Sequence, residues 1–298
     1  KTMWEESAFI PYQAATRCPA GPALVLAPHP DDEVFGCGGA IMSHLAVGDE
    51  VSVIILTDSD YGCFAAECDR RAARRREATA AAAILGYGVP SFWGQPDRGL
   101  TYDEALIARL LAAVEDSAAT LVYTPSWWEI HPDHCTLALA AVEAVRRCRR
   151  PLTLAMYEVG VPLHPNLLLD ITGLSERKQA AMACFVSQLQ VQRYDTQIMA
   201  LNQFRTYTLP AGVRFAEAFR LMTQEELRRD PLRAIRPGIY YSQTVETAGL
   251  APPLVSLLFI GTRAGLADAL DTVMAQTYAH LEVVLVMDQR REMMEVMR

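Results

Sequence analysis

The sequence alternates short apolar runs with segments of helical periodicity, and this alternation limits its possible folds more than any other feature. The apolar runs lie at residues 23–27, 51–57, 90–93, 120–124, 153–159 and 167–171. The helical segments lie at residues 34–47, 67–85, 103–118, 132–148 and 174–204. Several runs, such as ALVLA and VSVIILT, are apolar at consecutive positions, which is typical of strands covered by helices on both faces. The pattern predicts an α/β fold with a doubly wound, mainly parallel sheet.

Length, charge and cysteine content exclude several classes of protein. With 298 residues, of which 51% are hydrophobic, the chain can bury a full core and carry an appended segment. Its net charge of -8 argues against nucleic acid or an anionic membrane surface as a partner, since both attract clustered Lys and Arg. No apolar run approaches the roughly 20 residues of a membrane span. The seven cysteines form no C-x-x-C pair, so we expect reduced thiols in a cytoplasmic protein.

Acidic and imidazole side chains crowd the end of the first predicted strand. Residues 24–39 read LVLAPHPDDEVFGCGG, so that His29, Asp31, Asp32 and Glu33 directly follow an apolar run. Ligands of open α/β sheets bind beyond the carboxyl ends of the strands. The crowding therefore lies where a binding site is expected, although Glu33 can equally be a first-turn acid that favours the helix dipole.

A second polar cluster follows the predicted strand at 120–124, in the stretch PSWWEIHPDH. Pro132 suits the first helical position, and His131 and His134, three residues apart, then lie near one side of a helix N-terminus. Two loops thus supply His and Asp, which match a catalytic zinc (Zn²⁺) site with three protein ligands and one open position. Fe²⁺ or another divalent metal suits the same ligand set.

The same residues allow two other interpretations. Gly36 and Gly38 after the first strand, with Asp58 after the second, partly match a dinucleotide-binding fingerprint. Ile41 occupies the third glycine position, however, and the preceding acids would repel a pyrophosphate. The glycines are better explained by close packing of the helix on the sheet. Alternatively, the polar residues could serve only as helix caps and hydrogen-bonded turns. This interpretation requires that two separate clusters of His and Asp follow strand ends by coincidence.

The motifs around both clusters resemble those of the PIG-L/LmbE family of zinc-dependent de-N-acetylases, over about residues 22–222. The matching stretches are Pro28–Glu33, His131–His134, Arg74–Glu77, the run LLLDIT with Asp170, Lys178, Ser187–Gln188 and Ala216–Phe219. The resemblance implies a Rossmann-like fold and a hydrolase that removes an N-acetyl or other N-acyl group from an amino sugar or glycoconjugate, through attack by a zinc-activated water. The rival is a non-catalytic sugar-binding or scaffolding module, which would have no use for a base at Asp31.

The resemblance also implies roles for individual residues. It implies zinc ligation by His29, Asp32 and His134, and it implies that the general base is Asp31. His131 would stabilise the oxyanion or act as an acid, with Asp133 orienting it.

Substrate contacts are expected from Arg74, Asp58 and Trp128. The arginine run at 70–76 is mostly a solvated helix face, and Arg74 is the member expected to reach the substrate. Asp58 follows the second strand and could bind sugar hydroxyls, but acids are common in such loops. Trp128 could stack on a sugar or simply pack.

The C-terminal part has a different pattern. Residues 253–288 read as a strand, a helix and a second strand, and this βαβ unit resembles the opening of a family 2 glycosyltransferase. We therefore predict a deacetylase-like domain at 1–229, a proline-containing linker at 230–252 and a partial transferase-like segment at 253–298. The apolar strands of this segment are expected to pack against the first domain or another copy of the chain, so a homo-oligomer stays open.

Overall fold

The computed structural model describes residues 7, 10–58, 68–235, 255–261 and 281–287. The chain divides into two compact units, residues 1–239 and 240–298. No described helix is long and apolar enough to cross a membrane.

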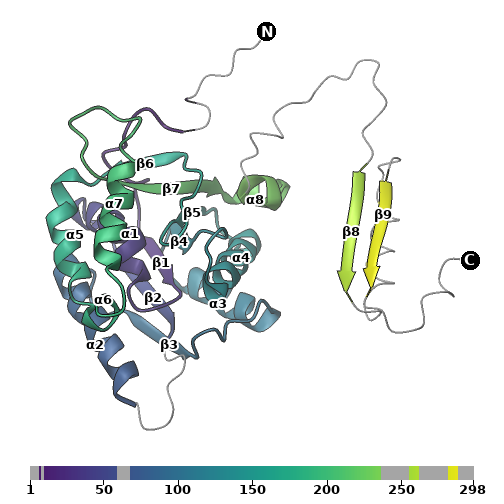
Figure 1. Ribbon diagram of the computed structural model, residues 1–298, viewed down its shortest axis with the longest axis horizontal. Coiled ribbons are helices and arrows are strands. Elements are labelled where there is room, and N and C mark those ends of the chain that lie inside the picture. Colours follow the sequence, from purple (N-terminus) through teal and green to yellow (C-terminus); the bar gives the residue numbers. More distant parts are fainter. Residues whose placement is uncertain (1–6, 8–9, 59–67, 236–254, 262–280, 288–298) are drawn as a thin grey trace, which may run out of the picture. The chain divides into compact units, whose positions relative to one another are not determined.

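The first unit is built on a seven-stranded sheet with the order β3-β2-β1-β4-β5-β7-β6 (Figure 1). Its strands are β1 (Ala23–Ala27), β2 (Val51–Thr57), β3 (Ser91–Gln95), β4 (Leu121–Pro125), β5 (Thr153–Tyr157), β6 (Leu167–Asp170) and β7 (Ala216–Thr223). The strands β1 to β5 pair in parallel, whereas β7 runs antiparallel to both of its neighbours. The predicted α/β class is confirmed, and each of the six predicted strands is present.

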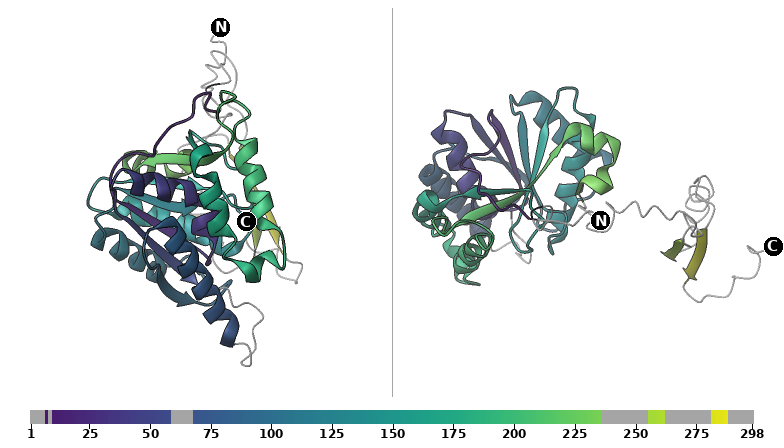
Figure 2. Two further views of the ribbon diagram at one scale, coloured as in Figure 1. Left: turned by 90° about the vertical axis from the view of Figure 1, so that its left-hand side faces the viewer. Right: turned by 90° about the horizontal axis from the view of Figure 1, so that it is seen from above.

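Helices cover both faces of this sheet (Figure 2). They are α1 (Asp32–Ala46), α2 (Cys68–Leu85), α3 (Glu104–Asp116), α4 (Pro132–Arg147), η3 (Thr172–Leu174, a 3-10 helix), α5 (Ser175–Met182), α6 (Val186–Leu189), α7 (Tyr194–Phe204), α8 (Gln224–Arg229) and α9 (Pro231–Ile235). Strand β1 shows why its run is continuously apolar: Leu24 and Leu26 join the core under α3 and α4, while Val25 joins the core under α1 and α2.

The structure differs from the predicted elements at two places. The single helix expected over 174–204 is divided into α5, α6 and α7, because the chain leaves the helical conformation at Phe185 and again at Arg193. The Phe185 ring is buried and packs edge-on against Phe35. Helix α9 lies within the range predicted as linker. Its Ala234 and Ile235 are buried in the core of the first unit, so the start of that range is an ordered part of this unit.

A buried ion pair connects the middle of α1 to β7. The carboxylate of Glu217 accepts the backbone N–H groups of Gly39 and Ala40 at 2.7 and 2.8 Å, and it binds the ammonium of Lys178 at 2.7 Å. Lys178 also donates to the carbonyl oxygen of Phe35 at 2.8 Å. The Phe35 carbonyl and the Gly39 amide are partners of each other in an ideal α-helix, so the ion pair takes part in the hydrogen bonding of the helix itself.

The glycines of α1 permit this close packing. A Cβ added to Gly36 would lie 2.2 Å from the Tyr157 ring, and one added to Gly39 would lie 2.3 Å from Ile171. Neither space can hold a methyl group without moving its neighbours. The sequence interpretation, that the glycines bring the helix close to the sheet, is confirmed.

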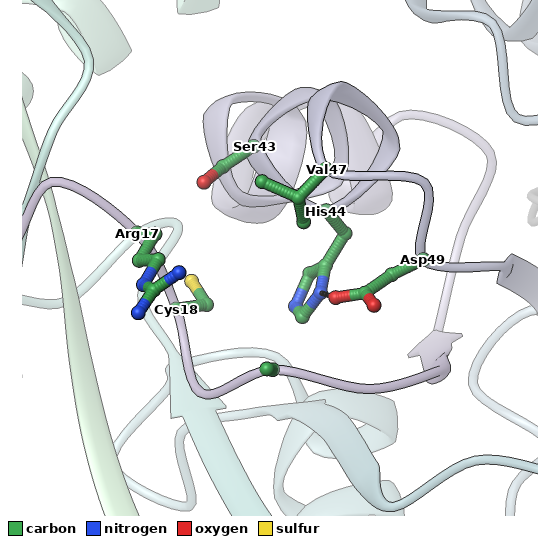
Figure 3. Close-up of a pocket in the computed structure, with 7 residues that line it drawn as sticks. Arg17, Cys18, Ser43, His44, Val47 and Asp49 are labelled. Carbon is green, nitrogen blue, oxygen red and sulfur yellow. Dashed lines mark hydrogen bonds and ion pairs between the residues drawn. The ribbon is translucent and has the colours of Figure 1, made fainter.

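The C-terminal end of α1 borders a cavity of about 210 Å³ (Figure 3). It is lined by Arg17, Cys18, Ala20, Ser43, His44, Val47 and Asp49. His44 bonds Asp49 at 3.0 Å through Nδ1 and the Tyr123 hydroxyl at 2.9 Å through Nε2. Both ring nitrogens are satisfied, so His44 is a structural residue.

In the second unit, β8 (Val255–Gly261) pairs in parallel with β9 (Leu281–Met287), in a register that aligns Val255 with Leu281 (Figure 1). Both strands lie within the predicted βαβ unit. The helix predicted between them falls outside the described residues, and the resemblance to a glycosyltransferase stays a prediction.

Candidate metal centre

Two strand ends and the loops that follow them form the candidate centre. His29 follows β1 and precedes α1, while His131 and His134 lie at the start of α4, which follows β4. Because β1 and β4 are paired neighbours in the sheet, the two loops emerge side by side at its carboxyl edge.

The three predicted ligands lie within contact of one another. His29 Nδ1 is 3.1 Å from Asp32 Oδ2 and 3.2 Å from His134 Nε2, and the last two atoms are 3.1 Å apart. Zinc with bonds of about 2.0–2.1 Å in tetrahedral geometry would hold its donor atoms about 3.3 Å apart. All three side chains are buried, and the backbone N–H of His29 donates to Asp32 Oδ2 at 3.0 Å. The donor set therefore fits a divalent metal.

A second group of donors adjoins the first on the other edge of the His29 ring. His29 Nε2 lies 3.3 Å from Asp133 Oδ2 and 3.5 Å from Asp97 Oδ1. His131 Nε2 is also 3.5 Å from Asp97 Oδ1. Within the described residues, two overlapping groups of side chains could hold an ion. One consists of His29, His131 and His134, and the other of His29, Asp97, His131 and Asp133. Asp97 was missed from the sequence, although an acid just beyond the third strand was an available signal.

Asp133, which was predicted to orient His131, lies between the His29 and His131 rings. Its carboxylate faces His29 and accepts the backbone N–H groups of Arg98 at 2.7 Å and Leu100 at 3.1 Å. His131 Nδ1 is 4.0 Å from that carboxylate and instead accepts the Asp133 backbone N–H as the N-cap of α4. The Asp133 carboxylate thus lies nearer to His29, at 3.3 Å, than to His131, and its role in orienting His131 stays a prediction.

The predicted base Asp31 occupies the N-cap position of α1 with a φ of 142°, which side-chain-bearing residues rarely adopt. Its Oδ2 receives Arg74 Nη2 at 3.1 Å, and its backbone N–H donates to Glu33 Oε2 at 3.0 Å. Glu33 is fully buried and also accepts the Tyr87 hydroxyl at 3.2 Å. Arg74 and Glu33 together hold the strained Asp31 in place, and such strain is concentrated at functional sites.

Burial and neighbouring charges alter the protonation of the cluster. Burial raises the pKa of Asp31 to about 6, although Arg74 opposes the shift. Burial, with the Asp31 charge, raises the pKa of Glu33 to about 8. Burial disfavours the charged form of His29, but the hydrogen bonds that its ring donates to the Asp133, Asp32 and Asp97 carboxylates outweigh this effect and raise the pKa of His29 well above the usual range. The carboxylates thus attract positive charge to the place where a metal would supply it.

The three predicted substrate contacts have different surroundings. Arg74 is buried and donates a hydrogen bond to Asp31, the predicted base. Asp58 is only 1% exposed and accepts two hydrogen bonds from Arg75, at 2.9 and 2.7 Å, so its carboxylate is held in an ion pair. Trp128 is 41% exposed, on the loop that carries His131. Its neighbour Trp127 is half-buried, packs against the core and donates to the carbonyl oxygen of Ile235.

Glu129 is a further residue that sequence reasoning missed. It is buried in the loop between β4 and α4, and its Oε2 lies 3.8 Å from His134 Nδ1. The same carboxylate accepts the backbone N–H groups of Val159 at 2.7 Å and Gly160 at 2.9 Å, in the segment after β5. The available signal was an acid between the two tryptophans and the histidines.

Comparisons with known proteins relate the first unit to deacetylases. Residues 24–145 match the family model described as PIG-L: GlcNAc-PI de-N-acetylase. Diacetylchitobiose deacetylase of Thermococcus kodakarensis is 26% identical over 219 residues, which cover 67% of this chain and 82% of the relative. The structure of N,N'-diacetylchitobiose deacetylase from Pyrococcus horikoshii superimposes with a TM-score of 0.62 at 26% identity, covering 69% of this chain and 85% of that one.

A relative with a different activity shares this similarity. The 4-oxalmesaconate hydratase of Pseudomonas putida is 28% identical over 204 residues, which cover 60% of this chain and 79% of the relative. The first unit thus has the α/β fold of PIG-L deacetylase structures, and its relatives include a hydratase as well as deacetylases.

Proposed function

We propose that the first unit is a metal-dependent hydrolase, with zinc as the expected metal, that removes an N-acetyl or other N-acyl group from an amino sugar or glycoconjugate. The observation that carries the proposal is the set of three donor atoms, from His29, Asp32 and His134, at mutual distances of 3.1–3.2 Å beside the Asp31 carboxylate. The deacetylase relatives support the substrate class.

In this proposal His29, Asp32 and His134 hold the metal. A bound divalent metal polarises the amide carbonyl and makes water a stronger acid. Asp31 takes a proton from the attacking water, and its bond from Arg74 fixes the carboxylate for that transfer. His131, on the more exposed side of the cluster, donates to the carbonyl oxygen or to the departing amine. Trp128 offers an exposed aromatic face for the sugar ring.

The hydratase relative makes hydration of a carbon–carbon double bond the second candidate function. Both reactions need a base and a polarised carbonyl, and only amide hydrolysis releases a carboxylic acid and a free amine. The test is to incubate the zinc-loaded protein with N-acetylglucosamine, N,N'-diacetylchitobiose, an N-acetylated nucleotide sugar and an unsaturated dicarboxylate. We expect acetate from at least one amide substrate. Hydration of the dicarboxylate without acetate release would overturn the proposal.

The metal assignment has its own test. His134→Ala removes one ligand and leaves the core unchanged, so we expect the loss of stoichiometric zinc, measured by elemental analysis, with an unchanged circular dichroism spectrum. His44→Ala is the matched control. His44 lies in the last turn of α1, whereas the proposed ligand Asp32 begins that helix, so this variant should retain zinc. Full zinc occupancy in the folded His134→Ala variant would contradict the ligand set.

A reducing, cytoplasmic location is also proposed. The five cysteines whose side chains are described, Cys18, Cys37, Cys135, Cys148 and Cys184, are free thiols, which supports this location.

A further inference from the structure

One nitrogen of a proposed metal ligand lacks a hydrogen-bond partner. His134 Nδ1 is buried and has none within the described part of the chain, while His134 Nε2 faces His29 and Asp32. A neutral imidazole that binds a metal through Nε2 carries its proton on Nδ1. That N–H then needs an acceptor, because an unsatisfied buried donor is costly.

Glu129 is the acceptor within reach. Its Oε2 lies 3.8 Å from His134 Nδ1, so a movement of less than about 1 Å brings the two atoms to hydrogen-bond distance. Both side chains are buried, so bulk water does not compete strongly for the contact. Histidine ligands of metals commonly donate their second nitrogen to a carboxylate in this way.

The Glu129 carboxylate also binds the backbone of the segment that follows β5. Glu129 Oε1 accepts Val159 N–H at 2.7 Å, and Oε2 accepts Gly160 N–H at 2.9 Å, so the atom facing His134 is also bonded to the chain that leaves β5. A Cβ at position 160 would lie 3.1 Å from Glu129 Oε2, which shows how closely that backbone approaches. A shift of Glu129 towards His134 therefore acts directly on residues 159 and 160.

From these contacts we propose that Glu129 is a positioning residue that couples metal binding at His134 to the ordering of residues 159–161. The inference rests on the proposed metal site and extends it to a segment outside it. With a metal bound at Nε2, the single proton of the neutral His134 ring would lie on Nδ1. Glu129 would accept this N–H in a hydrogen bond, and its oriented carboxylate would hold the amides of Val159 and Gly160 more firmly. Because coupling is reciprocal, an altered Glu129 weakens metal binding.

The first test needs no variant. Hydrogen exchange of the wild-type amides at Val159 and Gly160 is measured without metal and with saturating zinc. We expect slower exchange at both amides on zinc binding, and equal rates in the two states would overturn the coupling. The amides of β3, such as Phe92, lie on the far edge of the sheet and serve as the internal reference.

The second test changes the carboxylate. Glu129→Gln preserves size and one acceptor oxygen but removes the charge, and we expect zinc to bind 10–100-fold more weakly, by competition with a chelator, the usual effect of losing such a partner. Glu143→Gln removes an acid from α4, where it pairs with Arg146 and Arg147, and should leave zinc affinity unchanged. Thermal unfolding of metal-free protein separates loss of fold from loss of affinity.

The outcomes distinguish this inference from the proposed function. If wild-type protein binds no zinc, or if His134→Ala retains it, the metal site itself is wrong and the inference fails with it. If wild type binds zinc and His134→Ala does not, the site stands. Unchanged zinc affinity in folded Glu129→Gln would then overturn the positioning role alone.

Discussion

The ion pair beneath α1 makes a quantitative prediction about stability. Lys178 is fully buried, Glu217 is 1% exposed, and their charged atoms are 2.7 Å apart. Lys178→Met replaces the ammonium with an apolar group of similar length. It leaves Glu217 with its two amide donors from Gly39 and Ala40 but without a counter-ion.

The expected loss of stability in Lys178→Met depends on which groups still contact Glu217. Removing one partner of a buried ion pair destabilises a protein by about 3–5 kcal/mol. Because two amide donors still bind the Glu217 carboxylate, we expect a loss at the lower end of this range, about 3 kcal/mol. The total stability of a protein is about 5–15 kcal/mol, so this loss is a large part of it. For a domain of about 150–250 residues, 1 kcal/mol corresponds to about 2–4 °C in Tm, so we expect a decrease of about 6–12 °C.

Thermal and guanidinium unfolding of metal-free protein, followed by circular dichroism, provide the measurement. Arg193→Met is the control, because Arg193 pairs with Asp195 at 3.0 Å on the surface and its loss should not measurably change stability. The double variant Lys178→Met/Glu217→Gln removes both charges and should be more stable than the sum of the single effects, by about 0.5–3 kcal/mol. A decrease below about 1 kcal/mol in Lys178→Met, or strict additivity, would refute the reasoning.

Four further predictions concern other parts of the molecule. Asp31→Asn keeps the size of the side chain and removes its basicity, so zinc content should persist while turnover decreases about 10²–10⁴-fold, and unchanged turnover would assign the base to another residue. Gly36→Ala places a Cβ 2.2 Å from the Tyr157 ring and should destabilise the fold by about 1–3 kcal/mol, measured by guanidinium unfolding. Gly48→Ala is the control: its Cβ would have no neighbour within 4 Å, so any loss of stability comes from the positive φ alone. Burial raises the pKa of the Cys18 thiol from 9.0 to about 12, so Cys18 should resist thiol reagents at pH 8 until the protein unfolds. The folded state holds this proton more tightly than the unfolded state. The free energy of unfolding should therefore decrease as pH rises from 9.0 towards 12. Deletion of residues 250–298 should preserve zinc binding and amide hydrolysis, and a folded, zinc-loaded truncation without activity would mean that the C-terminal segment belongs to the active domain.

The sequence predicted the parallel part of the sheet because its determinants are local. The runs at 23–27 and 51–57 coincide with β1 and β2, since consecutive apolar residues are needed where helices cover both faces. Strand β7 was not predicted. It contains Glu217 and Arg220, and the buried carboxylate is satisfied by groups from α1 and α5 that are distant in sequence.

The candidate centre was predictable to a similar extent. His29, Asp32 and His134 converge because the carboxyl ends of neighbouring parallel strands meet at one edge, a consequence of topology that sequence order reveals. The roles of Asp97 and Glu129 depend on loop conformation, which no periodicity encodes. Glu129, for example, becomes significant only because residues 159–161 return to it.

The contacts of α1 also set an order of events during protein synthesis. Gly39 and its acceptor Glu217 are 178 residues apart, and Lys178 is synthesised between them. At about 5–20 residues per second, a ribosome needs on the order of ten to thirty seconds to extend the nascent chain from one to the other. During that interval the Gly39 and Ala40 amides lack the carboxylate that accepts them in the folded protein, so the packing of α1 seen here can form only after β7 has been synthesised.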